Sequence, residues 1–569
     1  MERTCGERLQ LDDHVIGIDF GTDSVRAVVV NARTGEEVGH AVSTYRRWAD
    51  GRYCDSRSSM FRQHPLDHIE GLETSVSSAL SECPAGTAET VRGISVDTTG
   101  STPGVVDSHG VPLAMNPSFE NNPNAMFILW KDHTAVAEAE EINSEARSWG
   151  GEDYTKYCGG CYSAEWFFSK ILHVSRADDA VREAACSWVE HCDWIPALLT
   201  GNTGPLGIKR SRCAAGHKAM WNASFSGLPS EEFLSDIDPV LTGLRGRLYS
   251  ETVTADHPAG TISPEWAERL GLSRDVVVGT GAIDAHFGAV GAGIKPGVLT
   301  KVMGTSTCDM LLAPAEAMQD RLIKGICGQV DGSIVPGLIG MEAGQSALGD
   351  LFAWFRDLLA WPVEHASSIA PEQAAAVADA ILDALSEEAG RRQPGPAAAS
   401  AIDWINGRRT PDADQMLRGA IAGLGLGSDA PDIFKALVDA AAFGARSIVE
   451  RFLSEGLPIE EVFALGGIAR RSPLVMQTLA DVLNMTVRVS ASEQTCALGA
   501  AMFAATVCGI YDDVTEAQQV MGKGFDVEYR PAPERVGLYR ERYDQYARLG
   551  EVIEVWQKRP AGGWTDARD

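Results

Sequence analysis

The feature that most constrains this chain is a short motif that occurs twice, in which two predicted strands flank a tip of glycine and hydroxyl residues. The first copy, VIGIDFGTDSVRAVVV, spans residues 15–30, and its first apolar run ends at Asp19. The predicted turn consists of Gly21, Thr22, Asp23 and Ser24. A β-branched run follows this turn, so the stretch predicts a β-hairpin with a carboxylate at the end of its first strand.

The second copy, LTKVMGTSTCDMLL, spans residues 299–312, and its predicted tip contains Gly304, Thr305 and Ser306. A tip of this kind can direct backbone N–H groups and hydroxyls at one point, which forms a binding site for phosphate. A carboxylate such as Asp19 can hold the Mg²⁺ that accompanies phosphates. One copy alone would favour an ordinary hydroxyl-rich turn, but two copies predict two similar domains that face each other across a cleft.

Length and charge narrow the classes of function. At 569 residues the chain exceeds what one hydrophobic core usually serves, which agrees with two large domains. Its formal net charge of −29, from 49 basic and 78 acidic side chains, opposes non-specific binding to nucleic acid or anionic membranes. No apolar run approaches the ~20 residues that span a bilayer, and the N-terminus lacks the apolar segment of a secretory signal. We therefore expect no nucleic-acid partner and no membrane.

The cysteines indicate a reducing compartment. Twelve cysteines in a chain of this length do not form a disulfide framework. Cys158 and Cys161 make a single C-x-x-C, but no second pair lies at the spacing of a zinc site. We therefore expect reduced, structural cysteines and a cytoplasmic protein.

A further predicted strand, residues 91–97, ends at an acid and leads into a loop rich in hydroxyls that begins at Thr98. Ligands of open α/β sheets bind beyond the carboxyl ends of strands, so this loop is a candidate substrate contact. The alternative, a turn whose hydroxyls only satisfy its own backbone, has equal standing on this stretch alone.

Residues 119–135, FENNPNAMFILWKDHTA, add a polar cluster made of Trp130, Lys131, Asp132 and His133. An aromatic ring against a carbon face, with charged groups on the hydroxyls, is a common way to hold a sugar. A solvated helix start is an alternative for Lys131 and His133, whereas Trp130 and Asp132 favour function. In a basic stretch at residues 209–218, Lys218 beside a glycine favours a ligand contact over a solvated patch.

Residues 276–293, VVVGTGAIDAHFGAVGAG, place Asp284 between an apolar strand and a helix of small residues. A carboxylate in such a position suits a general base that accepts a proton from a hydroxyl. An acid at a helix start is more often an N-cap. The second hairpin follows directly in sequence, and this context favours catalysis.

The second half contains three further candidates. Glu342 lies between glycines in GMEAGQ, and Asn406 lies in a polar loop. A strand over residues 462–465 leads into Gly466, Gly467 and a helix, an arrangement that lets the backbone approach a nucleotide. The small-residue helix predicted over residues 493–509 is expected to pack against that glycine slot. The chain has no G-x-x-x-x-G-K-[ST] sequence, so the motif of a P-loop enzyme is absent.

These stretches resemble the FGGY carbohydrate kinases. The resemblance rests on GIDFGTDSVRA, VDTTGSTP, NPNAMFILWKDHTA, RCAAGHKAMW, GAIDAH, VMGTSTCDM, GMEAGQSA, DWINGRRTP, ALGGIAR and CALGAA, which together run from about Val15 to Ala505. Within the family the chain looks most like members that phosphorylate L-ribulose. His133 stands where relatives that act on other polyols carry an arginine, which points away from glycerol and xylulose.

The resemblance implies an α/β fold with two ribonuclease H-like domains of the actin and hexokinase type, facing each other across a catalytic cleft. The expected N-terminal domain, residues 13–294, holds the sugar site, the first phosphate hairpin and the catalytic Asp. The expected C-terminal domain, residues 295–510, binds ATP. Residues 511–569 are expected to form a C-terminal helical extension with no site, and a homodimer is left open.

The resemblance also implies ATP-dependent phosphorylation of L-ribulose to L-ribulose 5-phosphate in L-arabinose catabolism. The alternative is a kinase for another pentulose or polyol, such as xylulose or ribitol. Asp284 is implied as the general base, and Asp19 and Asp284 as Mg²⁺ ligands. The implied ATP contacts are Gly21, Thr22, Asp23, Ser24, Gly304, Thr305, Ser306, Asn406, Gly466 and Gly467. The implied sugar contacts are Thr98, Trp130, Lys131, Asp132, Lys218, Asp284 and Glu342.

Two other classes share this fold. A conformational ATPase of the actin or chaperone kind would not need the cluster at residues 130–133 or a glycine-framed Asp284. A catalytically silent sugar-binding regulator would be expected to have lost Asp19 or Asp284, and both are present. A kinase is therefore the favoured class.

Overall fold

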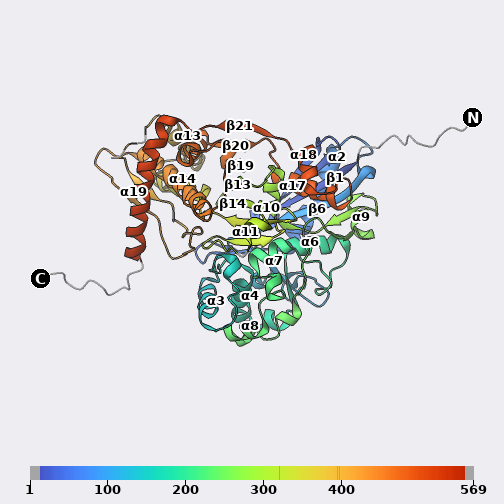
Figure 1. Cartoon of the computed structure of the whole chain (residues 1–569). Coiled ribbons are helices and arrows are strands. Elements are labelled where there is room, and N and C mark those ends of the chain that lie inside the picture. Colours follow the sequence, from blue (N-terminus) through green and yellow to red (C-terminus); the bar gives the residue numbers. More distant parts are fainter. Residues whose placement is uncertain (1–12, 320, 394, 396–397, 558–569) are drawn as a thin grey trace, which may run out of the picture. The chain divides into compact units, whose positions relative to one another are not determined.

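The computed structural model describes residues 13–319, 321–393, 395 and 398–557 (Figure 1). The chain divides into two compact units. Unit 1 comprises Met1–Pro296, Met310–Glu342 and Ser490–Gly524, and unit 2 comprises Gly297–Asp309, Ala343–Val489 and Phe525–Asp569. Residues 558–569 of the predicted C-terminal extension lie outside the described residues.

Unit 1 is built on a sheet with the strand order β10-β11-β6-β1-β2-β3. The first predicted hairpin is confirmed as β1 (His14–Phe20) and β2 (Ser24–Asn31), and β3 (Glu37–Thr44) continues the antiparallel meander. Strand β6 (Val91–Thr98) runs parallel to β1, and every residue of β1 is buried. An apolar strand buried along its whole length is typical of a parallel strand with both faces covered.

The other side of β6 pairs with two short strands that lead to Asp284. Strand β11 (Val277–Gly279) and strand β12 (Ala282–Ile283) both run parallel to β6. Strand β10 (Pro258–Thr261) pairs antiparallel with β11. Helix α10 (Asp284–Gly291) begins immediately after β12, so the predicted order of strand, Asp284 and small-residue helix is confirmed.

Two long helices pack on this sheet. Helix α2 (Pro65–Glu82) packs on β2 and β3. Helix α17 (Thr495–Val507) packs on β1, β6 and α10 (Figure 1). The predicted partner of this helix was the slot at Gly466, and the neighbours that the structure gives it within unit 1 are β1, β6 and α10. A Cβ at Gly17 would lie 1.8 Å from the carbonyl oxygen of Ala497, so the small residues serve close helix–sheet packing.

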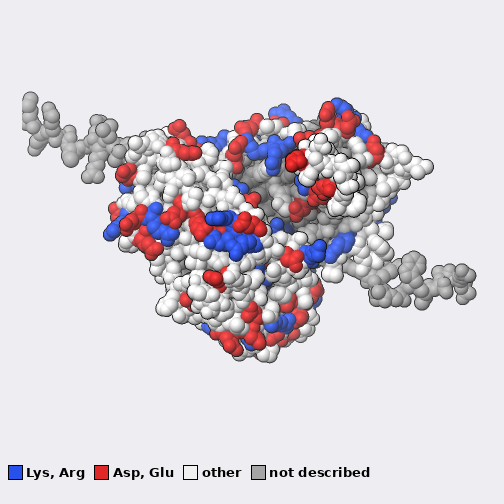
Figure 2. All heavy atoms as spheres, turned by 180° about the vertical axis from the view of Figure 1, so that it is seen from behind, with Lys and Arg blue, Asp and Glu red and all other residues white. Residues whose placement is uncertain are grey.

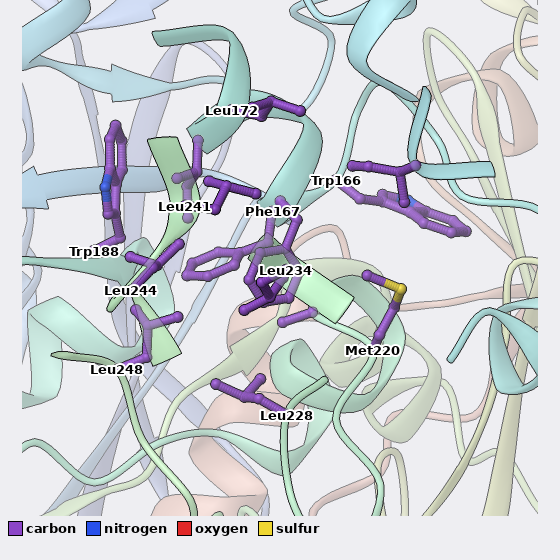
Figure 3. Close-up of a cluster of buried hydrophobic side chains, with 14 of the residues drawn as sticks. Trp166, Phe167, Leu172, Trp188, Met220, Leu228, Leu234, Leu241, Leu244 and Leu248 are labelled. Carbon is purple, nitrogen blue, oxygen red and sulfur yellow. The ribbon is translucent and has the colours of Figure 1, made fainter. Parts of the chain in front are cut away.

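Unit 1 also contains a helical region with its own hydrophobic core. Helices α4 (Phe167–Ala177) and α8 (Glu231–Ile237) contribute Phe167, Leu172 and Leu234 to it, and Figure 3 shows these side chains close together. Trp166 and Met220 belong to the same cluster. This core supports helix α7 (Arg212–Lys218), which carries a predicted site residue at its last position.

Unit 2 contains the neighbouring strands β13 (Val298–Met303), β19 (Glu461–Leu465), β20 (Val487–Ser490) and β21 (Phe525–Tyr529). β13 and β14 (Thr307–Pro314) confirm the second predicted hairpin. The sequence predicted only helices beyond residue 511, so β21 was missed.

Unit 2 also contains helices on both sides of β19 in sequence. They are α12 (Gly349–Glu364), α13 (Pro371–Gly390), α14 (Ala430–Ser454), α15 (Gly467–Arg471), α16 (Pro473–Leu483) and α19 (Pro533–Gln557). Helix α16 begins directly after Ser472, whose side chain accepts a hydrogen bond from the backbone N–H of Val475. Helix α19 packs on α14, on α16 and on β17 (Ser400–Ile402).

The visible surface carries charges of both signs. On the face shown in Figure 2, Lys and Arg side chains occur in small groups bordered by Asp and Glu. Within the part of the chain that the structure describes, no helix combines the length and the apolar character needed to cross a membrane.

Candidate active site

Three acids lie at one edge of the sheet in unit 1. Asp19 is the last but one residue of β1 and pairs across the strands with Asp97 on β6. Strand β12 pairs with the same stretch of β6, with Ala282 opposite Asp97, and Asp284 follows β12. The carboxyl ends of parallel strands meet at one edge, which is where ligands of open α/β sheets bind. The fold thus gathers three carboxylates that are far apart in sequence.

Asp284 has the environment of a proton acceptor. Ile283 is the N-cap of α10, so Asp284 is the first helical residue and the N-cap alternative is not realised. Its carboxylate accepts a hydrogen bond from the backbone N–H of Ala285 at 2.6 Å. Burial, followed by the negative charge of Asp19, raises the pKa of Asp284 to about 7. A base with a pKa near the working pH is well placed to take a proton from a hydroxyl.

Asp97 is the member of this group that the sequence analysis did not select. Its side chain is completely buried, and neither oxygen receives a hydrogen bond from an N–H or O–H group of the described residues. Burial, followed by the charges of Asp19 and Asp284, raises the pKa of Asp97 well above its usual range. The guanidinium of Arg26 places its Nη1 3.1 Å from Oδ2 of Asp19. Asp97 and Asp284 therefore hold their protons to a higher pH than ordinary carboxyl groups.

The tip of the first hairpin contacts Trp130. The backbone N–H of Gly21 donates to the carbonyl of Ser24 at 2.9 Å, and the Ser24 hydroxyl donates to Asp23 at 2.8 Å. The indole N–H of Trp130 donates to the Thr22 hydroxyl at 3.0 Å. Trp130, which the sequence suggested as a sugar contact, therefore lies against the predicted phosphate-binding tip.

Asp132 makes its hydrogen bonds within the protein. It is completely buried, and its Oδ2 accepts bonds from the backbone N–H of Phe61 at 2.7 Å and from Arg62 at 2.8 Å. Its Oδ1 accepts bonds from the backbone and hydroxyl of Thr134. The neighbouring Lys131 places its ammonium 4.6 Å from the centre of the Phe61 ring. In this arrangement Asp132 orders the loop around Phe61 and Lys131.

The hydroxyl loop after β6 is also buried and internally bonded. The Thr98 hydroxyl donates to the carbonyl of Thr99 at 3.0 Å, as in the self-satisfying turn considered from the sequence. Glu190 accepts bonds from the Ser101 hydroxyl and, at 2.8 Å, from the backbone N–H of Thr102. This loop is therefore a rigid part of the sheet edge.

A second polar cluster in unit 1 surrounds Glu342. Lys218, at the end of α7, places its ammonium 2.6 Å and 2.9 Å from the two carboxylate oxygens of Glu342 on β16 (Leu338–Ala343). His286 on α10 lies 3.2 Å from Oε2 of Glu342, and Nδ1 of His217 lies 3.6 Å from it. All four side chains are buried.

The charges around Glu342 shift its pKa in the direction opposite to the shifts of Asp97 and Asp284. Burial would raise the pKa of Glu342, but Lys218, followed by the two histidines, lowers it well below its usual range. The ligand atoms of His217, His286 and Glu342 lie within 4.8 Å of one another, a spacing that a metal ion could use. The Lys218 ammonium already contacts both Glu342 oxygens, which favours an ion pair. The sequence selected Lys218 and Glu342 but missed both histidines.

In unit 2, the start of α12 fixes the tip of the second hairpin. The backbone N–H of Gly349 donates to the carbonyl of Gly304 at 3.0 Å, and that of Leu348 donates to the carbonyl of Thr305 at 2.8 Å. The backbone N–H of Gly304 donates to the carbonyl of Ser306 at 3.0 Å. The tip therefore has a defined backbone conformation before any ligand binds.

The predicted glycine slot lies next to the same hairpin. Gly466 has a φ of +96°, and a Cβ there would lie 2.7 Å from the carbonyl oxygen of Met303, the last residue of β13. Gly467 begins α15. The glycine slot and the second hairpin thus meet at one place. Asn406 is exposed on a separate loop, beside Gly407.

Hairpins with glycine and hydroxyl tips, acids at a sheet edge and a glycine turn after a strand are the features expected of an α/β phosphotransferase of the sugar-kinase type. The model of the FGGY family of carbohydrate kinases, N-terminal domain, matches residues 14–291, and that of the C-terminal domain matches residues 299–508. The chain belongs to the FGGY family of carbohydrate kinases.

Curated relatives and solved structures agree with this family. The chain is 48% identical to a ribulokinase of Vibrio parahaemolyticus, over 95% of this chain and 96% of that protein. It is 37% identical to a ribulokinase of Halalkalibacterium halodurans, over 95% of each. A xylulose kinase structure from Rhodospirillum rubrum has a TM-score of 0.75 at 20% identity, covering 96% of this chain and 100% of that one. The last comparison concerns the fold alone.

Proposed function

We propose that this protein transfers the γ-phosphoryl group of ATP to the 5-hydroxyl of L-ribulose, forming L-ribulose 5-phosphate for L-arabinose catabolism. The substrate is supported by 48% identity over 95% of the chain to a protein named ribulokinase. Another pentulose or polyol, such as xylulose or ribitol, is the alternative acceptor. We place the reaction in the cytoplasm and leave a homodimer as a proposal that sedimentation can test.

The observation that carries the chemistry is the environment of Asp284. Phosphoryl transfer needs a positioned nucleophile, neutralised charge and a proton acceptor, with little covalent work for the protein. Asp284, with a pKa of about 7, is the proposed acceptor of the proton of the sugar hydroxyl. Its fixed bond to the N–H of Ala285 keeps one oxygen in place during this transfer.

The acids at the sheet edge also fit a divalent cation. Oxygen ligands from carboxylates are those that Mg²⁺ prefers, and Asp97 offers two buried oxygens that receive no N–H or O–H bond from the described residues. Asp97 lies beside Asp19, which it faces across the strands. We propose that Asp19 and Asp284 hold Mg²⁺ at this sheet edge. Bound Mg²⁺ would neutralise charge on the phosphates, while Arg26 keeps the Asp19 carboxylate in position.

We propose that the sugar is bound by the Glu342 cluster. Lys218 and Glu342 form a charged donor and acceptor pair whose geometry is fixed by His286. A site that hydrogen-bonds hydroxyls discriminates against analogues that lack them, because its buried groups are then left unpaired. The remaining proposed sugar residues are Thr98, Trp130, Lys131 and Asp132. For Asp132 the internal bonds support a role in holding the Lys131 loop.

Nucleotide binding is proposed for both hairpins and the glycine slot. The proposed contacts are Gly21, Thr22, Asp23, Ser24, Gly304, Thr305, Ser306, Asn406, Gly466 and Gly467. Residues 13–294 are proposed to carry the sugar and the base, residues 295–510 to carry ATP, and residues 511–569 to form an appended extension.

An assay of ADP release across a panel of acceptors tests this function. The panel contains L-ribulose, D-xylulose, ribitol and glycerol, and we expect the highest kcat/KM for L-ribulose. The Asp284→Asn variant serves as the control for contaminating kinases. A clear preference for D-xylulose or glycerol would contradict the proposed substrate, and ATP hydrolysis indifferent to sugars would contradict a sugar kinase.

A further inference from the structure

A buried hydrogen-bond network in unit 2 begins inside the second hairpin. The Lys301 ammonium on β13 lies 2.8 Å and 2.7 Å from the two carboxylate oxygens of Asp309 on β14. It also lies 3.3 Å from the Thr307 hydroxyl and 3.2 Å from Oε1 of Gln345. Lys301, Thr307, Asp309 and Gln345 are all buried. This ion pair joins the two strands directly behind the proposed phosphate tip.

Gln345 connects the hairpin to the rest of unit 2. Its backbone N–H donates to the Thr307 hydroxyl at 2.9 Å, and its carbonyl accepts from the Thr307 N–H at 3.0 Å. Its side-chain amide donates to Oδ2 of Asp403 at 3.0 Å and to the carbonyl of Ala441 at 2.8 Å. Glycine is required at residue 444, because a Cβ there would lie 2.4 Å from Oδ2 of Asp403. The orientation of Gln345 is therefore fully determined by its partners.

The network ends on the C-terminal helix. The hydroxyl of Tyr546 on α19 donates to Oδ1 of Asp403 at 2.7 Å, and both side chains are buried. The matched C-terminal family domain ends at residue 508, whereas α19 spans Pro533–Gln557. A residue outside the matched domain thus supplies the last donor of a network that reaches the hairpin.

We propose that Tyr546 is a positioning residue for the phosphate-binding hairpin, acting through Asp403, Gln345 and Thr307. This inference rests on the proposed function, since it requires that the hairpin binds the nucleotide. In a buried network each group orients the next, and a missing donor leaves its acceptor unpaired. Without the Tyr546 hydroxyl, Asp403 loses one of its two side-chain donors, and its hold on the Gln345 amide becomes weaker.

The same helix offers a matched control. Tyr543 lies one turn before Tyr546 and contacts Phe443 with its ring, as Tyr546 does. Its hydroxyl contacts the Ser447 hydroxyl at 3.1 Å and donates to Glu450 at 2.9 Å, away from the network. Replacing either tyrosine by phenylalanine removes one hydroxyl and keeps the ring. The two variants therefore separate loss of the network from loss of packing.

The test compares Tyr546→Phe with Tyr543→Phe in the full chain, with ATP and L-ribulose as substrates and calorimetry of ADP binding. We expect the KM for ATP and the Kd for ADP to rise about tenfold in Tyr546→Phe, as for an unpaired buried acceptor. The KM for L-ribulose is expected to stay within twofold, and Tyr543→Phe to match the wild type in all three quantities. A melting curve verifies that both variants fold.

A double-mutant cycle tests the route through Gln345. Gln345→Met keeps the length of the side chain and removes its side-chain hydrogen bonds to Asp403, Ala441 and Lys301. Adding Tyr546→Phe to it should therefore raise the KM for ATP no further. Additive effects would overturn the proposed route, and so would a Tyr546→Phe variant that binds ADP like the wild type. Loss of ATP and sugar affinity to the same degree would also contradict it. A wild-type protein that binds no ADP would instead refute the proposed function.

Discussion

Asp284, which is partly buried, and Glu342, which is buried, are both acids of unit 1 beside helix α10, yet their pKa values move in opposite directions. Asp284 lies beside Asp19, and burial together with that negative charge raises its pKa to about 7. Glu342 is buried too, but Lys218 and two histidines lower its pKa well below its usual range. Burial alone favours the neutral acid, so the neighbouring charges decide the difference.

This contrast assigns the two acids to different tasks. An acid that exchanges its proton near neutral pH can act as a base, whereas an acid that remains ionised can accept hydrogen bonds from hydroxyls throughout turnover. His286 contacts Glu342 and is the third residue of the helix that Asp284 begins, so α10 connects the two groups. The following predictions test whether the two acids are as distinct as their surroundings indicate.

The largest effect is expected at the base. Asp284→Asn removes the proton acceptor and keeps the shape of the side chain, so kcat should fall ~10²–10⁴-fold while the Kd for L-ribulose stays nearly unchanged. In the wild type, kcat/KM should decrease as the pH falls below about 7, because Asp284 becomes protonated. Single-turnover kinetics measure the chemical step directly. A loss of less than about tenfold would exclude Asp284 as the base.

The second effect concerns the ionised acid. Glu342→Gln leaves the buried Lys218 ammonium without its carboxylate partner, a loss that costs roughly 2–5 kcal/mol. We therefore expect kcat/KM for L-ribulose to fall ~10²-fold, with the Kd for ADP unchanged as the internal control. If the variant binds the sugar normally and is only less stable, Glu342 has a structural role and the contrast with Asp284 no longer concerns function.

The third effect concerns the metal. Asp19→Asn should raise the Mg²⁺ concentration for half-maximal rate about tenfold, because one carboxylate ligand is lost. Arg26 would lose its ion-pair partner in this variant, so Arg26→Lys is the matched control for that contact. Titration of Mg²⁺ at saturating ATP measures the requirement. An unchanged requirement with weaker sugar binding would place Asp19 on the sugar side of the comparison.

The sequence predicted the local elements of this contrast well. Hairpins, the helix after Asp284 and the glycine turn at Gly466 are set by residues that lie next to one another along the chain. The acid at the end of β6 was visible as well, but its proximity to Asp19 depends on parallel pairing between distant strands. The contacts of His217 and His286 with Glu342 have the same origin.

The direction in which a side chain points was the other property that could not be predicted from the sequence. Asp132 and Lys131 are neighbours in a polar cluster, but the structure turns the Asp132 carboxylate inward to Arg62 and Thr134. The small residues of α17 indicated close packing without indicating the partner, which proved to be β1 and α10. A side chain's environment is set by tertiary contacts, and these arise only when distant parts of the chain fold together.

The smallest effect is expected at Asp97 and concerns stability. The folded-state pKa values of Asp97 and Asp284 are raised, so above pH ~4 the folded protein binds more protons than the unfolded chain. Its free energy of unfolding should therefore decrease as the pH rises from the usual carboxyl range toward about 7, where Asp284 titrates.

Asp97→Asn removes one of these groups, so without Mg²⁺ the variant should show a weaker pH dependence. At pH 7 it should be more stable than the wild type, because a buried carboxyl beside Asp19 and Asp284 is replaced by a group that carries no charge. Asp383→Asn, at an exposed acid of α13, is the control. Urea unfolding at pH 5 and pH 7 measures the stability and its pH dependence. The contrary outcome is an Asp97→Asn variant that is less stable at pH 7 and has an unchanged pH dependence. It would show that a partner balances the Asp97 carboxyl and that Asp97 and Asp284 do not form one group.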